Sequence, residues 1–231
     1  MIKVKGLKKQ YNNVLALDIP ALEIGSGESF GLIGNNGAGK TTFFRLILDL
    51  LAATEGEVLS KEISVSRSEE WKKYSGSYLD EGFLIDYLSP AEYFDFIGYL
   101  HGMNAEDIAT FFLQLDGFAG EDLWKSRKPI STLSKGNKSK TGIVAALMGN
   151  PDIVILDEPF AHLDPSSQIS LKRLLKRINA EQQITLLVSS HDLAHVTEVC
   201  NRIVLLESGL VIRDFATTPD TLRELEDYFT R

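Results

Sequence analysis

The spacing of apolar residues changes along the chain and divides it into strand-like and helix-like stretches. Residues 2–5 alternate apolar and polar side chains, as a strand with one buried face does, and residues 14–24 hold two more alternating segments separated by Pro20. Residues 56–58 and 62–65 predict a strand pair, and residues 74–79 predict a core strand. The N-terminal third is therefore expected to be mainly β structure, interrupted by one helix over residues 43–51.

A block of helical patterns follows. Ser89, Pro90 and Glu92 form a capping-box sequence with proline at the first helical position, and this helix is expected to run to about residue 101, where Gly102 can end it. A second helix is expected over residues 105–115, capped by Asn104, and a short third one over residues 121–125. Because strand patterns are missing there, residues 81–149 are interpreted as a helical subdomain inserted into one domain of residues 1–231.

Strand and helix patterns alternate again after this block. Residues 153–156 are continuously apolar, as in the middle of a covered parallel sheet. A long amphipathic helix is expected from Asp164, a buried strand over residues 184–189, a helix from about Asp192, a hairpin turning at Ser208 and Gly209, and a terminal helix ending near Tyr228. The predicted fold is α/β, a mainly parallel sheet with flanking helices, an N-terminal antiparallel β portion and the helical insert.

Composition narrows the possible functions. The 231 residues carry a formal net charge of −8, which disfavours a dominant nucleic-acid surface. Cys200 is the single cysteine, so no internal disulfide can form and a reducing compartment is expected. The N-terminus lacks the apolar core of a signal peptide, and no run of 18 uncharged apolar residues is present, so the chain is not expected to span a membrane.

The most specific motif lies between a predicted strand over residues 28–33 and the helix over residues 43–51. It fits the phosphate-loop pattern G-x-x-x-x-G-K-[ST] at Gly34, Gly39, Lys40 and Thr41. Glycines let backbone N–H groups close around phosphate oxygens, lysine adds a positive charge, and the hydroxyl suits Mg²⁺. The expected phosphate-binding residues are Asn35, Asn36, Gly37, Ala38, Gly39, Lys40, Thr41 and Thr42. The alternative is a glycine-rich turn before an ordinary helix.

A second motif follows the apolar strand of residues 153–156. Asp157 ends this strand, which places a carboxylate beside the metal ion of a bound nucleotide, and Glu158 comes one residue later, where it can polarise an attacking water. The alternative interpretation is an acidic turn after a core strand. The phosphate loop upstream makes the catalytic interpretation much stronger.

These two motifs, with residues 133–137, resemble the nucleotide-binding subunit of an ATP-binding-cassette (ABC) transporter. The resemblance covers essentially the whole chain. Ser134 and Gly136 keep two positions of the Leu-Ser-Gly-Gly-Gln signature, whereas its third and fifth positions are Lys135 and Asn137. The resemblance implies that Ser134 and Gly136 face the γ-phosphate bound on a second subunit; Ser134 also fits a plain helix cap. Lys135 resembles the branch paired with separate export-type permeases.

Other residues match this family one by one. Asp164 is kept in the dimer-contacting loop, where His162 is unusual, and His191 resembles the switch histidine at the γ-phosphate. Tyr11 resembles the aromatic residue that stacks on adenine, with a core or surface tyrosine as the alternative. Glu81 falls where the family has a metal-contacting glutamine, so its contact with the metal is an open prediction.

The resemblance implies a P-loop NTPase fold and a Mg²⁺-dependent ATPase. Two copies of the chain are expected to form a homodimer around two ATP molecules and to drive transport, with export favoured, through a separate permease. The chain is then peripheral on the cytoplasmic face of the plasma membrane, with no nucleic-acid partner, and the apolar residues 81–88 are expected to help form the permease groove. Two alternatives are a soluble ABC-type ATPase acting on ribosomes or DNA and a regulatory subunit that no longer hydrolyses ATP.

Overall fold

The computed structural model describes residues 1–115 and 117–230, so two positions of the predicted single domain, 116 and 231, lie outside it. The described strands are β1 (Ile2–Tyr11), β2 (Val14–Ile24), β3 (Ser29–Ile33), β4 (Glu55–Ser60), β5 (Ile63–Ser64), β6 (Ser75–Tyr78), β7 (Ile153–Asp157), β8 (Thr185–Ser190), β9 (Arg202–Glu207) and β10 (Leu210–Ala216). The α-helices are α1 (Lys40–Ile47), α2 (Pro90–Leu100), α3 (Ala105–Leu113), α4 (Glu121–Trp124), α5 (Lys135–Leu147), α6 (Pro165–Gln182), α7 (Leu193–Val199) and α8 (Thr221–Phe229).

The strands form one mixed sheet in the order β5-β4-β1-β2-β10-β9-β3-β8-β7-β6. The run β9-β3-β8-β7-β6 is parallel, whereas β1, β2, β4 and β5 pair antiparallel and β10 joins the two parts. The predicted α/β architecture is therefore confirmed, with an unbroken run of parallel strands in one half of the sheet. Carboxyl ends of parallel strands meet at one edge, and this edge carries the candidate site.

Two strands differ from the prediction. β2 is one continuous strand through the exposed Pro20, because β2 meets β10 only at Asp18, and a proline beyond that pair costs no ladder hydrogen bond on that side. β6 was predicted as a core strand but is the last strand of the sheet. Only Tyr78 of β6 is buried, since neighbours cover the strand on one edge alone.

The parallel strands separate two hydrophobic cores. Along β7, Ile153 and Ile155 pack into the core shared with α1 and the antiparallel strands. Val154 and Leu156 point to the opposite face and pack into the core shared with helices α5, α6 and α7. This alternation explains why residues 153–156 are all apolar, since both faces of a covered parallel sheet are buried.

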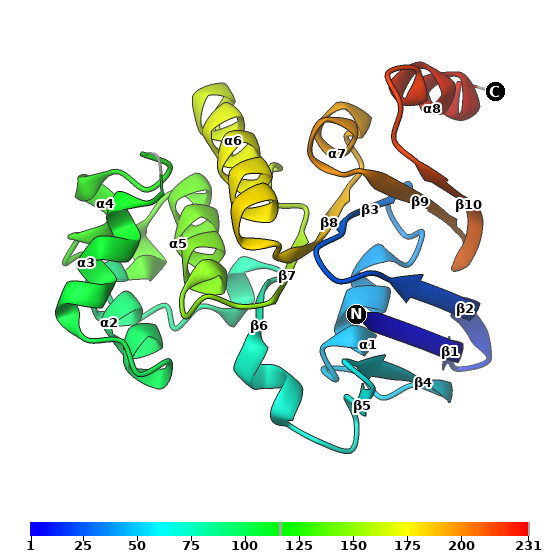
Figure 1. Ribbon diagram of the computed structural model, residues 1–231, viewed down its shortest axis with the longest axis horizontal. Helices are drawn as coiled ribbons and strands as arrows, with labels where there is room; N and C mark the ends of the chain where they lie inside the picture. Colours follow the sequence, from blue (N-terminus) through cyan, green and yellow to red (C-terminus); the bar gives the residue numbers. More distant parts are fainter. Residues whose placement is uncertain (116, 231) are drawn as a thin grey trace.

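The helices expected between residues 81 and 149 are present, and Figure 1 shows them beyond the β6 end of the sheet. The capping box of α2 is confirmed: the Glu92 backbone N–H donates to Ser89 Oγ (3.3 Å), and the Ser89 N–H donates to the Glu92 carboxylate (2.9 Å). Asn104 caps α3 in the same way. The three helices α2, α3 and α4 share an aromatic cluster in which the Phe112 ring lies 5.0 Å from Phe94 and 4.6 Å from Trp124.

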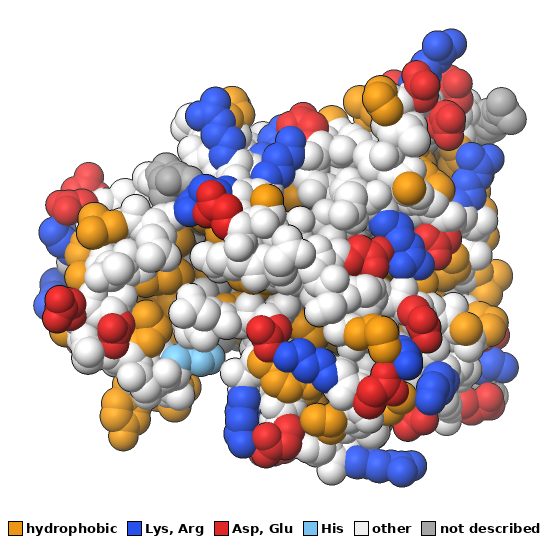
Figure 2. Space-filling model, in the orientation of Figure 1, with side chains coloured by type: hydrophobic (Ala, Val, Ile, Leu, Met, Phe, Trp, Pro, Cys, Tyr) orange, Lys and Arg blue, Asp and Glu red, His pale blue; other side chains and the backbone are white. Residues whose placement is uncertain are grey.

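Large apolar side chains remain exposed on and beside α2. They are Phe83, Tyr87, Phe96, Tyr99 and Leu100. Figure 2 shows hydrophobic side chains on the visible surface of this helical block and a hollow between the block and the rest of the molecule. Within residues 1–115 and 117–230, no helix combines the length and apolar character needed to cross a bilayer.

The contact between β6 and α5 leaves no room for a side chain at Gly76. A Cβ atom built there would lie 1.8 Å from the backbone oxygen of Ala146, and backbone cannot rotate away as a flexible side chain can. We expect Gly76→Ala to lower the free energy of unfolding by about 1–3 kcal/mol, as overpacking does. Urea denaturation measures this change, with the neighbouring exposed Ser77→Ala as control. Equal stability of the two variants would show that the strand and helix separate easily.

Candidate active site

The phosphate loop joins β3 to α1 in the conformation that the motif requires. Gly37 (φ +83°) and Gly39 (φ +108°) occupy the left-handed region, which L-residues with a side chain rarely adopt. Lys40 folds into the loop, and its Nζ donates to the Gly34 carbonyl (2.7 Å). Because Gly39 caps α1 without a side chain, no cap oxygen competes for the first helical N–H groups. The loop is thus built to receive an anion.

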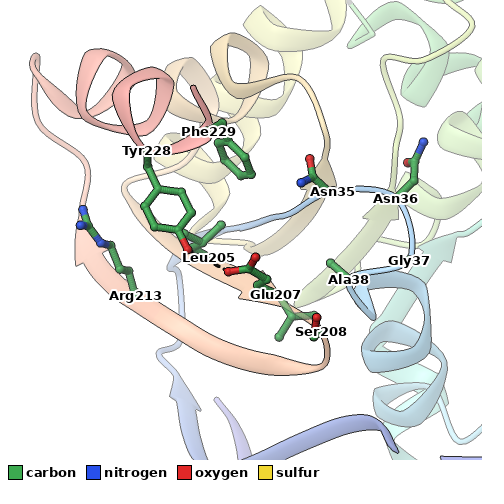
Figure 3. Close-up of a pocket in the computed structure, with 11 residues that line it drawn as sticks. Asn35, Asn36, Gly37, Ala38, Leu205, Glu207, Ser208, Arg213, Tyr228 and Phe229 are labelled. Atoms are coloured by element: carbon green, nitrogen blue, oxygen red, sulfur yellow. Dashed lines mark hydrogen bonds between the residues drawn. The ribbon is translucent and has the colours of Figure 1, made fainter. Parts of the chain in front are cut away.

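Two cavities share the loop as a common wall. One, of about 450 Å³, is lined by the loop from Asn35 to Thr42 together with Leu15, Ala16, Glu158 and Ser208. The other, of about 610 Å³, is lined by the loop and by Arg213, Tyr228 and Phe229 of the C-terminal part, which lie across the cavity from the loop (Figure 3). Tyr228 donates a hydrogen bond to Glu207 (2.8 Å) there. The first cavity contains Lys40 and Glu158, which makes it the candidate reaction site.

Asp157 stands at the end of β7 with both carboxylate oxygens occupied. Thr41 Oγ1 donates to one oxygen (2.5 Å), and the Ser189 hydroxyl donates to the other. Burial raises the pKa of Asp157 above its ordinary value, and the two hydroxyl donors only partly oppose this shift. A cation next to Thr41 and Asp157 would relieve the cost of burying the charge.

Glu158 lies in the left-handed region (φ +49°), so the backbone turns sharply after Asp157. Its N–H donates to Ser189 Oγ (3.0 Å), which holds this turn against β8. The carboxylate reaches Lys40 Nζ (3.3 Å) on one side and His191 Nδ1 (2.8 Å) on the other. The structure therefore brings Lys40, Glu158 and His191 into contact, and their catalytic roles stay predictions.

Glu81 lies on a third cavity of about 420 Å³, which Thr41, Asp157 and Glu158 also line. Its contact with a metal ion stays a prediction. Its carboxylate pairs with Lys138 Nζ at 3.6 Å. Glu81 thus lines the cavity and at the same time forms an ion pair with a lysine of α5.

Other predicted site residues lie apart from this cluster. Tyr11 ends β1 and is half exposed, but Leu15 and Ala16, not Tyr11, line the loop cavity. Ser134 caps α5 by accepting from the Asn137 N–H (3.3 Å).

Two more of these residues lie around the loop that follows Glu158. A Cβ at Gly136 would meet the His162 carbonyl at 2.8 Å, so the start of α5 fits closely against that loop. Asp164 caps α6, and hydrogen bonds from Ser166 and Ser167 hold its pKa well below the ordinary value.

The sequence analysis missed two contributors to the site. Ser189 contacts both Asp157 and the Glu158 backbone, and Ser208, at the β9–β10 turn, lines both cavities beside the loop. A polar residue at the end of an otherwise apolar strand was the available signal for Ser189. The position of Ser208 depends on where the hairpin packs, which its local sequence does not specify.

Comparison with known proteins identifies the family of this chain. The family model described as "ABC transporter" matches residues 17–161, which include the phosphate loop and the Asp157–Glu158 pair. The chain belongs to the ABC transporter family. It is an ATP-binding subunit of this family and an ATPase.

Relatives along most of the chain carry the same kind of name. An ABC transporter ATP-binding protein of Methanocaldococcus jannaschii, MJ1023, is 33% identical over 220 residues, covering 91% of this chain and 76% of its own length. The methionine import ATP-binding protein MetN of Clostridioides difficile is 33% identical over 218 residues, covering 92% and 67%. Because an import protein stands among the relatives, the family match leaves the direction of transport open.

Solved structures match the fold as well. A dimeric ATP-binding cassette, MJ0796, in a post-hydrolysis state bound to ADP and Pi, superposes with a TM-score of 0.83 at 27% identity, covering 94% of this chain and 99% of that one. The protein cbiO1 of Clostridium perfringens, part of an ABC transporter complex, superposes with a TM-score of 0.78 at 25% identity, covering 99% and 92%. These superpositions show that the chain has the fold of a P-loop ABC cassette.

The raised pKa of Asp157 predicts a pH-dependent gain of stability in Asp157→Asn. Between the ordinary pKa and the raised value, the folded chain keeps a proton that the unfolded chain has lost, so the Asp157 contribution to stability falls as pH rises through this window. Asparagine removes this penalty, which is about 1.4 kcal/mol per pKa unit. We expect the nucleotide-free variant to be more stable than the native chain at pH 7–8.

This advantage should shrink as the pH falls towards the ordinary aspartate pKa. Urea denaturation across a pH series measures it, with Asp95→Asn on the exposed face of α2 as the matched control. A variant that is less stable at neutral pH would show that the hydroxyl contacts outweigh burial.

Proposed function

We propose that this chain binds and hydrolyses ATP with Mg²⁺ to drive transport through a separate membrane permease. The observation that carries the proposal is the convergence of Lys40 and Thr41 from the phosphate loop with Asp157, Glu158 and His191 from the ends of β7 and β8. Charge, hydroxyl and carboxylate groups are then all present around one cavity, as phosphoryl transfer to water requires.

The loop from Asn35 to Thr42 is proposed to bind the phosphates. Its backbone N–H groups and the start of α1 neutralise phosphate oxygens, and Lys40 exchanges its contact with the Gly34 carbonyl for the β and γ phosphates. The adenine is proposed to stack on Tyr11, which lies at the end of β1 with its ring exposed and near the cavity wall formed by β2.

The residues beside the loop fit a Mg²⁺ ion. Thr41 and Asp157 supply adjacent hydroxyl and carboxylate oxygens, the donors that this ion prefers, and Asp157 is a buried carboxylate that a cation stabilises. Thr41 would ligate the ion, Asp157 would hold it through water, and Glu81 would approach from the opposite cavity wall. When bound, Mg²⁺ neutralises charge on the phosphates.

Glu158 is the proposed general base. Its carboxylate orients and deprotonates the attacking water, and the contact with His191 Nδ1 fixes its direction. His191 would then support the γ-phosphate. In the nucleotide-free chain the Glu158 charge is balanced by Lys40, so phosphate binding would free the carboxylate for water.

Two copies are proposed to form the ATP-bound state. The solved relative MJ0796 is a dimer bound to ADP and Pi, and this chain superposes on it along nearly its whole length. The loop of one copy would face Ser134 and Gly136 of the other, with Asp164 shaping the contacting loop. The helix start at Ser134 carries a partial positive charge suited to the γ-phosphate.

The permease is proposed to dock between β6 and α2. A groove of about 200 Å³ lies there, lined by the edge strand, Phe83, Leu84 and Ile97, and Tyr87 beside it is 76% exposed. Such an exposed apolar surface is expected to be covered by a partner. The chain would then lie on the cytoplasmic face of the plasma membrane. Export as the direction rests on Lys135 alone.

Glu158→Gln should abolish most ATP turnover while preserving ATP binding. The amide keeps the shape but cannot accept the proton, and general-base assistance contributes about 10²- to 10⁴-fold in rate. Phosphate release measures turnover and a fluorescent ATP analogue measures binding. The variant should also accumulate as an ATP-bound dimer, because hydrolysis no longer opens it. A folded variant with native turnover would remove Glu158 from this role.

Phe83→Ser and Tyr87→Ser should uncouple the chain from its permease. Both side chains are largely exposed beside the groove, so basal ATPase activity is expected to stay near the native value while transport and permease-stimulated hydrolysis fall. Vesicle transport assays with the reconstituted complex give this comparison, and Leu210→Ser, an exposed apolar residue on β10, is the control. Normal assembly and transport by both variants would contradict the docking surface.

A further inference from the structure

Three carboxylates line the cavity of about 420 Å³ next to Thr41 and Asp157, called the metal-side cavity from here on, and each has a basic side chain as partner. Glu158 pairs with Lys40 inside the site at 3.3 Å. Asp80 pairs with Arg45 and Glu81 pairs with Lys138, each at 3.6 Å. Arg45 belongs to α1, the helix of the phosphate loop, whereas Lys138 belongs to α5. The Glu81–Lys138 pair therefore connects the cavity to a different helix.

Lys138 is attached to the turn of α5 that begins at Ser134. Its backbone N–H donates to the Ser134 carbonyl (2.9 Å), so the two residues form one helical turn. The next residue, Ser139, accepts a hydrogen bond from the Tyr78 hydroxyl (3.0 Å). Tyr78 also packs on Gly142, where a Cβ would lie 2.2 Å from the ring. The strand end before Glu81 is thus held closely against α5.

We propose that Lys138 is a positioning residue that links Glu81, on the metal side of a subunit's own ATP site, to the start of α5. This inference rests on the proposed homodimer, in which that helix start serves the ATP bound by the other copy. If Glu81 helps to hold Mg²⁺, a shift of its carboxylate towards the cavity would move Lys138 through the ion pair, and with it the Ser134 end of α5. The two ATP sites would communicate by this route.

The link depends on the carboxylate of Glu81. A carboxylate attracts both a metal cation and the Lys138 ammonium, whereas an amide at the same position forms a weaker contact with either. The pair is partly exposed, with side-chain exposures of 42% for Glu81 and 22% for Lys138, so its effect should be modest and sensitive to salt. A contact of this strength would shift the equilibrium between monomer and ATP-bound dimer but would not prevent dimer formation.

The test uses the Glu158→Gln chain, in which ATP-bound dimers accumulate. Light scattering after size exclusion gives the MgATP concentration for half-maximal dimer formation, a readout independent of turnover. Lys138→Gln should raise this concentration about two- to fivefold, the factor expected for a partly exposed ion pair, and Lys138→Arg should restore it. Lys125→Gln removes another lysine–glutamate pair, with Glu121 at 3.1 Å on α4, and should change nothing.

A double-mutant cycle separates coupling from a merely structural role. Glu81→Gln and Lys138→Gln should each raise the MgATP concentration for half-maximal dimer formation. In the double variant the increase should be smaller than the product of the two single increases, because both changes remove the same contact. Independent effects, or a change in thermal stability without a change in dimer formation, would overturn the inference.

The same measurements distinguish this inference from the homodimer proposal. If the Glu158→Gln chain with native Lys138 stays monomeric in MgATP, the homodimer proposal fails and the inference fails with it. If that chain dimerises and Lys138→Gln dimerises equally well, only the inference is wrong.

Discussion

Burial of the Asp157 carboxylate at the end of β7 is the constraint on which the site depends. β7 lies between β8 and β6 and is covered on both faces, so its last residue has little contact with water. The hydroxyls of Thr41 and Ser189 donate hydrogen bonds to the carboxylate and Lys40 adds a positive charge nearby, but burial outweighs them and raises the pKa of Asp157. The fold thus bears an unfavourable burial that a bound cation would relieve, as functional sites often do.

The remaining site contacts behave as substitutes for the nucleotide. Lys40 contacts a loop carbonyl and Glu158, and both contacts occupy an ammonium that is otherwise suited to phosphate. Glu158 in turn is shared between Lys40 and His191. Because Lys40, Glu158 and His191 already have partners, we propose that ATP binding exchanges one set of contacts for another.

The helical block connects the ATP site to the surface of the molecule through β6. β6 is an edge strand, so its free side meets the groove beside α2, while its end leads directly to Glu81 on the metal-side cavity. Close packing at Gly76 and Gly142 joins the same strand to α5. One short strand therefore contacts the proposed permease surface, the ATP site and the helix that is proposed to serve the second subunit.

The amino-acid sequence by itself determined the features that depend on neighbours along the chain. The caps at Ser89 and Asn104 were predictable because capping joins residues three positions apart, and the phosphate loop because its glycines and lysine act within one turn. The extent of the helical insert, about 81–149, and the roles of the individual site residues remain predictions.

Only the tertiary structure decided what depends on packing between distant segments. Thr41 and Asp157 are 116 residues apart and meet because β3 and β7 both flank β8. The place of β6 at the sheet edge, the continuity of β2 through Pro20, and the contact of Ser189 with Asp157 follow from strand order. A strand's own sequence records which of its faces is buried but not which strand will lie beside it, and this is the physical reason for the difference.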